Sequence, residues 1–282
     1  MAQTKTQIQA ILAEAQTQPR HRFGQNFMID GNLVRIIADA GEISADDLII
    51  EVGPGTGTLT EELLARGAQV VAVEIDRDLA QSLRTRLADH QNFRLIEGDA
   101  LSNKHTLCPE LTEVLRANSH RKRKLIANLP YNIASPLVIE LLIEGLDLLV
   151  FTVQKEVGDR LRATASSDDY GPLTVVVQML AEVEVLRTLP SQAFWPAPKI
   201  SSALVKVIAK NRLGNDAAEF GRFVHQLLSS RRKTIRKALM QADYDADVLL
   251  ADLGIDPQIR SETLAPEQVH RLFVRVKNKP IV

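Results

Sequence analysis

The sequence contains a single cysteine, Cys108, among its 282 residues. One cysteine excludes an internal disulfide and a zinc site built from several thiolates, and it is typical of a protein from a reducing compartment. The sequence also lacks an apolar run that is long and uncharged enough to span a membrane. Its first residues are polar and do not follow the basic-then-apolar pattern of a secretory signal. We therefore expect a cytoplasmic protein, and we predict no metal centre.

A large excess of charge is lacking as well. The formal net charge is −1 and the pI is about 6.6, which argues against a nucleic-acid binder that works by bulk charge. The basic residues are clustered, however, and local clusters set the field that a polyanion meets. The clusters lie at residues 19–22, 120–124 and 231–237.

Apolar runs that alternate with helical patterns organise most of the chain. Five runs predict buried strands, at Leu48–Val52, Gln69–Val73, Phe93–Ile96, Leu125–Ala127 and Leu148–Val153. Two later segments, Glu182–Val185 and Ser202–Ile208, predict a hairpin that closes the sheet. The alternation is typical of an α/β fold with a Rossmann-like, mostly parallel sheet and a terminal antiparallel hairpin. Ligands of such sheets bind beyond the carboxyl ends of the strands.

The pattern changes near residue 211, where strand signals end and helical periodicity takes over. This change predicts two domains. The first, over residues 1–210, includes an N-terminal extension at 1–21, and the second is a small all-helical domain over residues 211–282.

Basic residues punctuate the first long helix expected in the second domain. Its apolar face comprises Phe220, Phe223, Val224, Leu227, Leu228, Ile235 and Leu239. Arg231 falls in the middle of this stripe, which places it at a domain junction or lets it reach a phosphate. Lys233 and Arg236 lie on the other side. They form either a basic ridge or an ordinary solvated face.

A glycine-rich turn follows the first predicted strand. Glycines at a strand-to-helix turn let a ligand approach the backbone, as Gly53 and Gly55 do here. Thr58 stands at the third glycine position of the dinucleotide fingerprint, which disfavours a nicotinamide dehydrogenase. Glu74 ends the second strand, about 20 residues on, where a carboxylate accepts hydrogen bonds from ribose hydroxyls. The combination predicts a cofactor that contains adenosine.

Asp99 ends the third strand at the same edge of the sheet. A carboxylate there can accept a hydrogen bond from an adenine amino group. The alternative is that Asp99 caps the next helix.

The stretch from Asn128 to Tyr131 ends the fourth strand. Pro130 stiffens the turn, Asn128 offers an amide and Tyr131 an aromatic face. Such a turn can hold a planar ring that bears an exocyclic amine. The alternative is an ordinary strand-to-helix turn with a half-buried tyrosine.

Two further loops carry aromatic residues. Residues 22–30 predict an ordered loop, either a lid over a site or a hydrophobic staple on the helix that follows Asp30. Residues 194–199 contain two prolines and display Phe194 and Trp195. These rings either stack on a base or anchor the loop in the core.

Together these motifs resemble a class I S-adenosylmethionine-dependent methyltransferase that acts on adenine N6. The resemblance is closer still to the small-subunit ribosomal RNA adenine N6-dimethyltransferases, the KsgA (RsmA) family. It covers nearly the whole chain from about Arg22. The segments that carry it are residues 23–27, 51–57, 74, 99, 128–131, 170–173, 194–199, 230–234 and 260–264.

The resemblance implies dimethylation of two adjacent adenosines near the 3′ end of small-subunit (16S-type) RNA and a role in subunit biogenesis. It implies S-adenosylmethionine as cofactor, the small subunit as partner, and a monomer. The cofactor contacts it implies are Asn26, Met28, Gly53, Gly55, Glu74, Asp99 and Asn128. The catalytic residues are Asn128, Leu129, Pro130, Tyr131 and Phe194, and the RNA contacts are Arg231, Arg232, Lys233 and Arg236. The first domain then binds cofactor, and the helical domain binds RNA or ribosome. Met28 stands where the family usually has Leu, and Lys237 where Asn is common.

The chemistry follows from the weak nucleophilicity of the adenine amine. The Asn128 side-chain oxygen and the Leu129 or Pro130 carbonyl would accept from its hydrogens and stabilise the positive charge that develops on the nitrogen. Tyr131 and, by resemblance, Phe194 would sandwich the base.

Three alternatives remain. A large-subunit RNA adenine methyltransferase of the antibiotic-resistance type usually has Ile where Leu129 stands, and a DNA adenine methyltransferase usually has Pro there. The third alternative is a non-catalytic assembly or transcription factor that retains the fold. Intact Glu74, Asp99 and Asn128 argue against lost cofactor binding.

Overall fold

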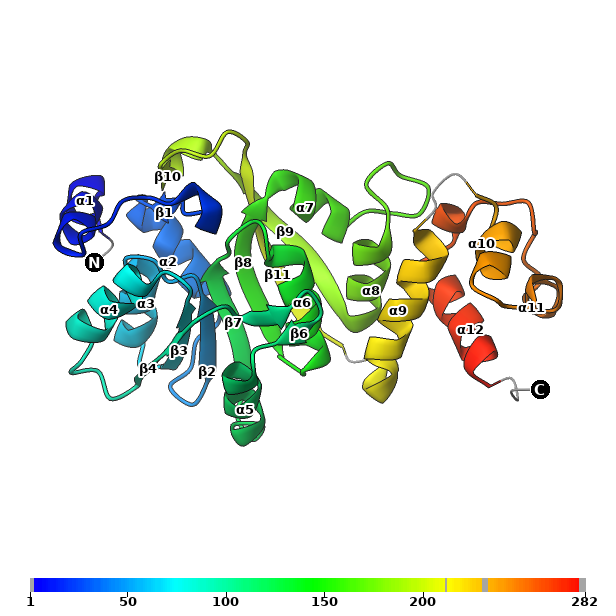
Figure 1. Ribbon diagram of the computed structural model, residues 1–282, viewed down its shortest axis with the longest axis horizontal. Coiled ribbons are helices and arrows are strands. Elements are labelled where there is room, and N and C mark those ends of the chain that lie inside the picture. Colours follow the sequence, from blue (N-terminus) through cyan, green and yellow to red (C-terminus); the bar gives the residue numbers. More distant parts are fainter. Residues whose placement is uncertain (1–2, 211, 230–232, 279–282) are drawn as a thin grey trace. The chain divides into compact units, whose positions relative to one another are not determined.

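The computed structural model describes residues 3–210, 212–229 and 233–278 (Figure 1). The chain forms two compact units. Unit 1 comprises residues 1–158 and 184–209, and unit 2 comprises residues 159–183 and 210–282. Within the described ranges, helices are too short or too polar to cross a membrane.

A seven-stranded sheet, with the strand order β4-β3-β2-β7-β8-β11-β9, forms the centre of unit 1. Its members are β2 (Leu48–Val52), β3 (Gln69–Glu74), β4 (Phe93–Glu97), β7 (Arg123–Asn128), β8 (Leu148–Gln154), β9 (Ala181–Leu189) and β11 (Ser202–Ala209). The first five strands in this order are parallel, and β11 runs antiparallel to β8. The predicted mostly parallel sheet is confirmed, with β11 and β9 at its edge.

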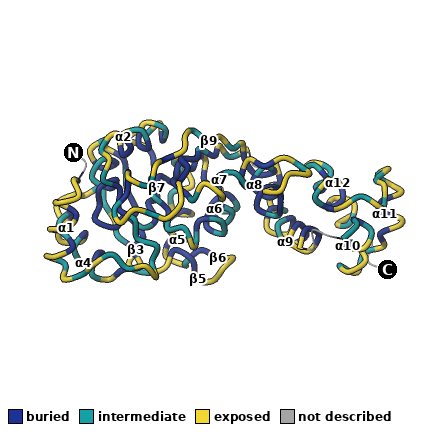
Figure 2. Tube along the Cα trace, turned by 90° about the horizontal axis from the view of Figure 1, so that it is seen from above, coloured by how far each residue is buried: buried dark blue, intermediate teal, exposed yellow. Residues whose placement is uncertain are grey.

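Helices α3 (Thr58–Ala65), α4 (Arg77–Arg86), α5 (Pro109–Ala117) and α6 (Ala134–Ile143) lie in the connections between the parallel strands. Helix α2 (Gly31–Ala40) precedes β2, and α7 (Lys155–Leu161) follows β8. Apolar residues of α2 and α3, among them Ile37 and Leu63, share one core cluster with Ile49 and Ile126 of the strands. Asp30 is the N-cap of α2, because its side chain accepts from the amides of Asn32 and Leu33. Strands β2, β3, β7, β8 and β11 are mostly buried, whereas α1 and α4 carry exposed residues (Figure 2).

The connection between β4 and β7 contains a small hairpin that the sequence analysis did not anticipate. Its strands are β5 (Leu101–Asn103) and β6 (Thr106–Leu107). Strands this short leave no periodicity to recognise.

The N-terminal segment packs against the rest of unit 1. Helix α1 (Lys5–Glu14) begins with a capping box at Thr4, and its Ile8 and Leu12 are buried beside Phe27 and Leu79. The two aromatic loops of the sequence analysis pair with each other: β1 (Phe27–Met28) runs antiparallel to β10 (Phe194–Trp195). They are therefore one structural feature built from distant parts of the chain.

Unit 2 is helical. Its helices are α8 (Pro172–Leu180), α9 (Ala217–Leu228), α10 (Ile235–Gln241), α11 (Ala246–Leu253) and α12 (Pro266–Lys277). Short 3₁₀ helices, at His21–Phe23 and Ser191–Ala193 in unit 1 and at Gly214–Asp216 and Ser261–Thr263 in unit 2, complete the elements. Residues 159–183 belong to unit 2, although the sequence analysis placed them in the first domain. They pack with the C-terminal helices, since the Tyr170 hydroxyl donates to Leu264 O at 2.6 Å.

The prediction of a single helix across the apolar stripe is wrong. Helix α9 ends at Leu228, and α10 begins at Ile235 with Thr234 as its N-cap, whose side chain accepts from the Lys237 amide. The apolar pattern continues from α9 into α10 because both helices bury their apolar residues in the same unit. The Phe273 ring lies 5.5 Å from Phe220 and 5.7 Å from Phe223.

Candidate functional site

A cleft lies at the carboxyl ends of β2, β3, β4 and β7. All seven predicted cofactor contacts line it: Asn26, Met28, Gly53, Gly55, Glu74, Asp99 and Asn128. The structure thus brings together residues that span about 100 positions in the chain.

The glycine turn forms one wall of the cleft. Gly53, Gly55 and Gly57 have positive φ angles of 73°, 61° and 84°, a region that side chains disfavour. A Cβ atom on Gly53 would lie 2.9 Å from Pro130 Cγ, and one on Gly55 would lie 2.9 Å from Phe27 Cε1. Glycine is therefore required here both by backbone conformation and by close approach of neighbouring residues.

Glu74 is buried at the end of β3 with both of its oxygens held by backbone amides. Oε2 accepts from Gly55 N at 3.0 Å and Oε1 accepts from Asp76 N at 2.9 Å. Burial raises the pKa of Glu74 to about 7; the two amides oppose this shift, and the charge of Asp76 adds to it. The carboxylate is thus fixed in orientation and protonates close to neutral pH.

Glu51 is a buried cleft residue that the sequence analysis missed. It lies in β2, its side chain accepts from Thr60 Oγ1 at 2.7 Å, and burial raises its pKa to about 8. The charge of Glu74 contributes in the same direction. A lone Glu within the apolar run Leu48–Val52 was the available signal, because an unpaired buried carboxylate is costly.

Asp99 is exposed on the rim of the cleft, and its Oδ1 accepts from Leu101 N at 3.0 Å. Strand β5, and not a helix, follows it, so the helix-capping alternative is wrong.

Asn128 ends β7, and its amide is held from two sides. Its Nδ2 donates to Asn26 O at 2.8 Å, and Thr152 Oγ1, on β8, donates to its Oδ1. A carbonyl oxygen has two lone pairs, so one acceptor position on Oδ1 stays available. The two contacts fix which end of the amide is the acceptor.

The rest of the turn is also anchored. Leu129 is buried, and Pro130 packs beside Gly53. The Tyr131 hydroxyl shares a hydrogen bond of 2.7 Å with Ser202 Oγ at the start of β11, and burial raises the pKa of Tyr131. Ser202 and Thr152 are supports that no local pattern in the sequence indicated.

Phe194 lies away from the cleft wall. Its side chain is 2% exposed and belongs to the core cluster that includes Met28 and Leu33. Trp195 stacks on Phe27 with ring centroids 6.5 Å apart. The loop is therefore anchored in the core, as the alternative interpretation of the sequence had it.

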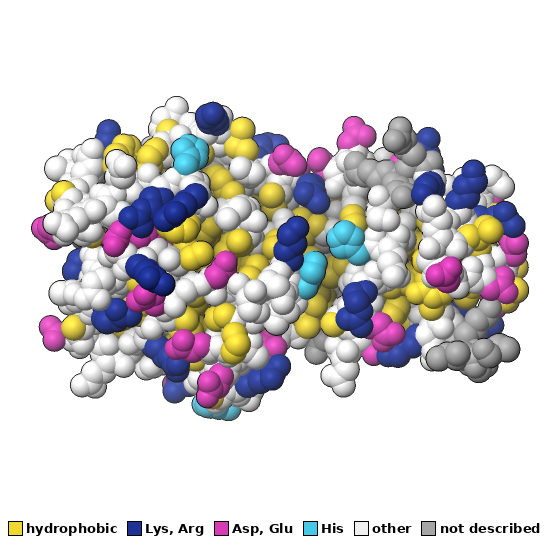
Figure 3. All heavy atoms as spheres, in the orientation of Figure 1, with side chains coloured by type: hydrophobic (Ala, Val, Ile, Leu, Met, Phe, Trp, Pro, Cys, Tyr) yellow, Lys and Arg dark blue, Asp and Glu magenta, His cyan; other side chains and the backbone are white. Residues whose placement is uncertain are grey.

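The predicted RNA contacts lie in unit 2. Arg231 and Arg232 fall outside the described residues. Lys233 Nζ donates to Gln241 Oε1 at 2.5 Å. Arg236 forms a two-bonded ion pair with Asp247, at 2.6 and 2.8 Å, and this pair lowers the pKa of the Asp247 carboxyl. Figure 3 shows basic and acidic side chains interspersed over the visible surface.

Comparison with known proteins places these features in a family. The family described as ribosomal RNA adenine dimethylase matches residues 16–278. A ribosomal RNA small subunit methyltransferase A from Hahella chejuensis is 41% identical over 94% of this chain and 95% of its own length.

Two solved structures are similar as well. A dimethyladenosine transferase from Plasmodium falciparum has a TM-score of 0.73 at 23% identity, covering 89% of this chain and 97% of that one, and shows the fold. The 23S rRNA methyltransferase ErmE has a TM-score of 0.63 at 27% identity, covering 90% of this chain and 100% of that one.

Proposed function

The chain belongs to the ribosomal RNA adenine dimethylase family, and from that premise we propose that it transfers methyl groups from S-adenosylmethionine to adenine N6 of small-subunit ribosomal RNA. The proposed targets are two adjacent adenosines near the 3′ end, each methylated twice. The proposal includes a cytoplasmic monomer that contributes to small-subunit biogenesis.

The side chains that line the cleft suit the cofactor in their chemistry. Glu74 presents a fixed carboxylate to the ribose hydroxyls, and Asp99, on the rim, can accept from the adenine amino group. Ile75 lies between them in the chain, lines the cleft and is 40% exposed, so its apolar surface is available to the adenine ring. Gly53 and Gly55 of the glycine turn also line the cleft, so their backbone is available to the remainder of the ligand.

Asn128 is the central catalytic residue in this proposal. When bound, S-adenosylmethionine supplies an electrophilic methyl group. The free lone pair of Asn128 Oδ1 and the backbone carbonyl of Leu129 or Pro130 accept from the two N6 hydrogens. This draws the nitrogen lone pair out of conjugation and stabilises the charge that develops. The bound cofactor would supply the methyl group and keep the electron pair of the broken sulfur–carbon bond, and the N6 proton would leave to water.

The observation that carries the proposal is the position of Asn128. Its amide is held by Asn26 and Thr152 at the same cleft that holds Glu74 and Asp99. Tyr131 supplies an aromatic face for the base. Phe194 is buried in the core, so it supports the β1–β10 pair, and a direct stacking role requires movement of that pair.

The experiment is labelled methyl transfer to unmethylated small subunits, large subunits and duplex DNA, followed by nucleoside analysis. We expect N6,N6-dimethyladenosine in small subunits only. Label in large subunits would favour the alternative of a large-subunit RNA methyltransferase like ErmE. The chain is 27% identical to ErmE. Cofactor binding with no transfer to any of the three would favour a non-catalytic binding role.

RNA recognition is proposed to rest on unit 2 and on RNA shape and protein partners. The net charge of −1 supplies little general attraction to RNA. Affinity for isolated oligonucleotides should be weak and steeply dependent on salt. Tight binding that salt does not change would contradict this.

A further inference from the structure

One wall of the cleft comes from the segment before and within β1. Phe23, Gly24, Gln25 and Asn26 all line it. This segment has no strand neighbour until Phe27, so other contacts must hold it in place.

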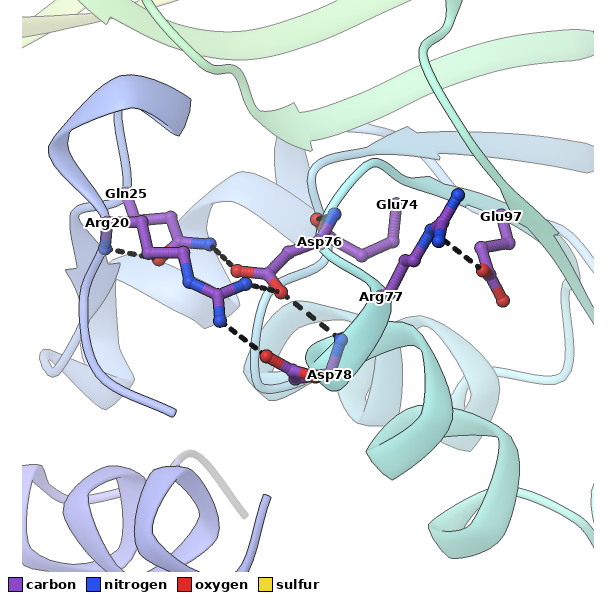
Figure 4. Close-up of polar contacts among 7 residues, drawn as sticks. All are labelled: Arg20, Gln25, Glu74, Asp76, Arg77, Asp78 and Glu97. Atoms are coloured by element: carbon purple, nitrogen blue, oxygen red, sulfur yellow. Dashed lines mark hydrogen bonds and ion pairs between the residues drawn. The ribbon is translucent and has the colours of Figure 1, made fainter. Parts of the chain in front are cut away.

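Figure 4 shows the contacts that hold this segment: Arg20 and Gln25 both face Asp76. Arg20 Nη1 lies 2.6 Å from Asp76 Oδ1, and its Nη2 contacts Asp78. Gln25 Nε2 donates to Asp76 Oδ2 at 2.8 Å, and Gln25 Oε1 accepts from Arg20 N at 2.7 Å. Arg20 therefore bridges two carboxylates, while Gln25 locks the same segment to one of them. We call these four residues, Arg20, Gln25, Asp76 and Asp78, the latch.

Asp76 is the centre of the latch. Its side chain is fully buried, whereas that of Arg20 is 30% exposed. It also caps α4 through the Asp78 amide at 3.2 Å. A buried carboxylate is stable when donors satisfy both oxygens, and here an arginine, an amide side chain and a backbone amide do so.

The latch is hydrogen-bonded directly to Glu74, the carboxylate proposed to bind the ribose hydroxyls. The backbone amide of Asp76 donates to Glu74 Oε1 at 2.9 Å. One residue thus orients Glu74 with its main chain and the segment 20–26 with its side chain. A change in the latch is transmitted to both sides of the cofactor cleft.

We propose that Arg20 is a positioning residue for cofactor binding, which acts through Asp76 to hold the cleft wall and Glu74 in their binding arrangement. The inference rests on the proposed function only in the identity of the ligand. Arg20 touches neither the RNA base nor the reacting atoms in this account, so it governs cofactor affinity and not the rate of methyl transfer.

The test is calorimetric binding of S-adenosylmethionine to the full chain without RNA. Arg20→Gln should raise Kd about tenfold, because removing one partner leaves a buried carboxylate without its counter-charge. Arg20→Lys should give an intermediate value, since one ammonium cannot bridge two carboxylates in a fork.

Two matched controls remove a positive charge nearby. Arg22→Gln alters the same segment, where Arg22 is exposed and lies over the Phe23 ring. Arg77→Gln alters the residue next to Asp76, whose side chain is 88% exposed and faces Glu97 (Figure 4). Both controls should keep the wild-type Kd.

Steady-state kinetics separates positioning from a general structural role. Arg20→Gln should raise KM for the cofactor and leave kcat at saturation unchanged. An unchanged Kd in Arg20→Gln, or a lower melting temperature with wild-type affinity in the folded protein, would overturn the inference and leave the proposed function intact. Tight cofactor binding by wild type with no transfer to RNA would overturn the proposed function and leave the latch standing.

Discussion

Charged side chains serve different purposes in the two units. At the cleft of unit 1, Glu51 and Glu74 are buried, with backbone amides or a hydroxyl as their partners. In unit 2, the pairs Arg236–Asp247 and Arg275–Asp252 lie at the surface. Desolvation makes the first group energetically consequential, whereas exposed pairs contribute little. Substitutions should therefore have large effects at the cleft and small ones on the helical surface.

The largest effect on cofactor affinity is expected from Gly55→Ala. A Cβ atom there would lie 2.9 Å from Phe27 Cε1 on a backbone with φ of 61°. The free turn should relax to relieve about 2 kcal/mol of strain, and restoring its shape on binding should weaken cofactor affinity by roughly 30-fold. Isothermal titration calorimetry measures the Kd for the cofactor. Gly171→Ala is the control, because a Cβ atom on Gly171 meets nothing within 4 Å. Wild-type affinity in Gly55→Ala would show that the turn does not contact the ligand.

Thr152→Val tests how the Asn128 amide is oriented. The substitution removes the hydroxyl that donates to Asn128 Oδ1 while keeping the shape of the buried side chain. We expect kcat to fall about tenfold, as for a displaced catalytic acceptor, and Thr152→Ser to retain most activity. In an Asn128→Ala background, Thr152→Val should have no further effect. Additive losses would mean that Thr152 acts independently of Asn128.

The pKa of Glu74, raised to about 7, predicts a pH dependence of cofactor affinity. Ribose hydroxyls donate to the ionised carboxylate, so affinity should rise about tenfold between pH 6 and pH 8. Glu74→Gln should flatten the profile, whereas a Glu51→Gln control should keep the rise through pH 7. A wild-type affinity that falls with pH would contradict the assignment.

The raised pKa values of Glu51 and Glu74 also predict how the stability of the ligand-free protein changes with pH. Glu51 and Glu74 have folded pKa values of about 8 and 7, above the ordinary value of 4.5. Their protonated forms favour folding below pH 4.5, and this contribution is lost as pH rises through 7 and 8. Melting temperatures of Glu51→Gln and Glu74→Gln should therefore exceed that of wild type most clearly above pH 8. An equal difference at pH 5 would contradict this.

The smallest effect is expected on the helical surface. Asp247 neutralises Arg236, so Asp247→Asn should release a cation and strengthen RNA binding two- to threefold, about the effect of one added phosphate contact. Lys233→Gln should weaken binding and lower the salt slope by about one. Filter binding across salt concentrations measures both. Weaker binding by Asp247→Asn would mean that the ion pair itself shapes the RNA surface.

The sequence predicted the part of the fold that depends on periodicity and the part of the site that depends on strand ends. Buried runs such as Leu48–Val52 became strands, and Glu74 and Asn128, which end their strands, met at one cleft. Pairing of β1 with β10 escaped prediction because two-residue strands far apart in the chain carry no pattern. The residues that hold others in place, Thr152 and Arg20, escaped because their roles depend on side-chain contacts across the fold.

In unit 2 the sequence indicated which residues are buried but not where the helices end. Its all-helical class was predicted, but the apolar stripe that continues past Leu228 suggested one helix where two occur. Periodicity reports which residues are buried and does not report where the chain turns, and a cap such as Thr234 is a weak local signal. Phe194 is a related case, since an aromatic residue in a proline-rich loop packs into the core here.

The most direct test of the account is the single-turnover rate of methyl transfer by Asn128→Ala on unmethylated small subunits at saturating cofactor. Truncation removes the acceptor that Asn26 and Thr152 hold in place. We expect a rate at least about 100-fold below wild type, as for the loss of a group that stabilises transition-state charge, with N6,N6-dimethyladenosine as the wild-type product. A rate within twofold of wild type would show that Asn128 is only a turn residue and would contradict the central claim.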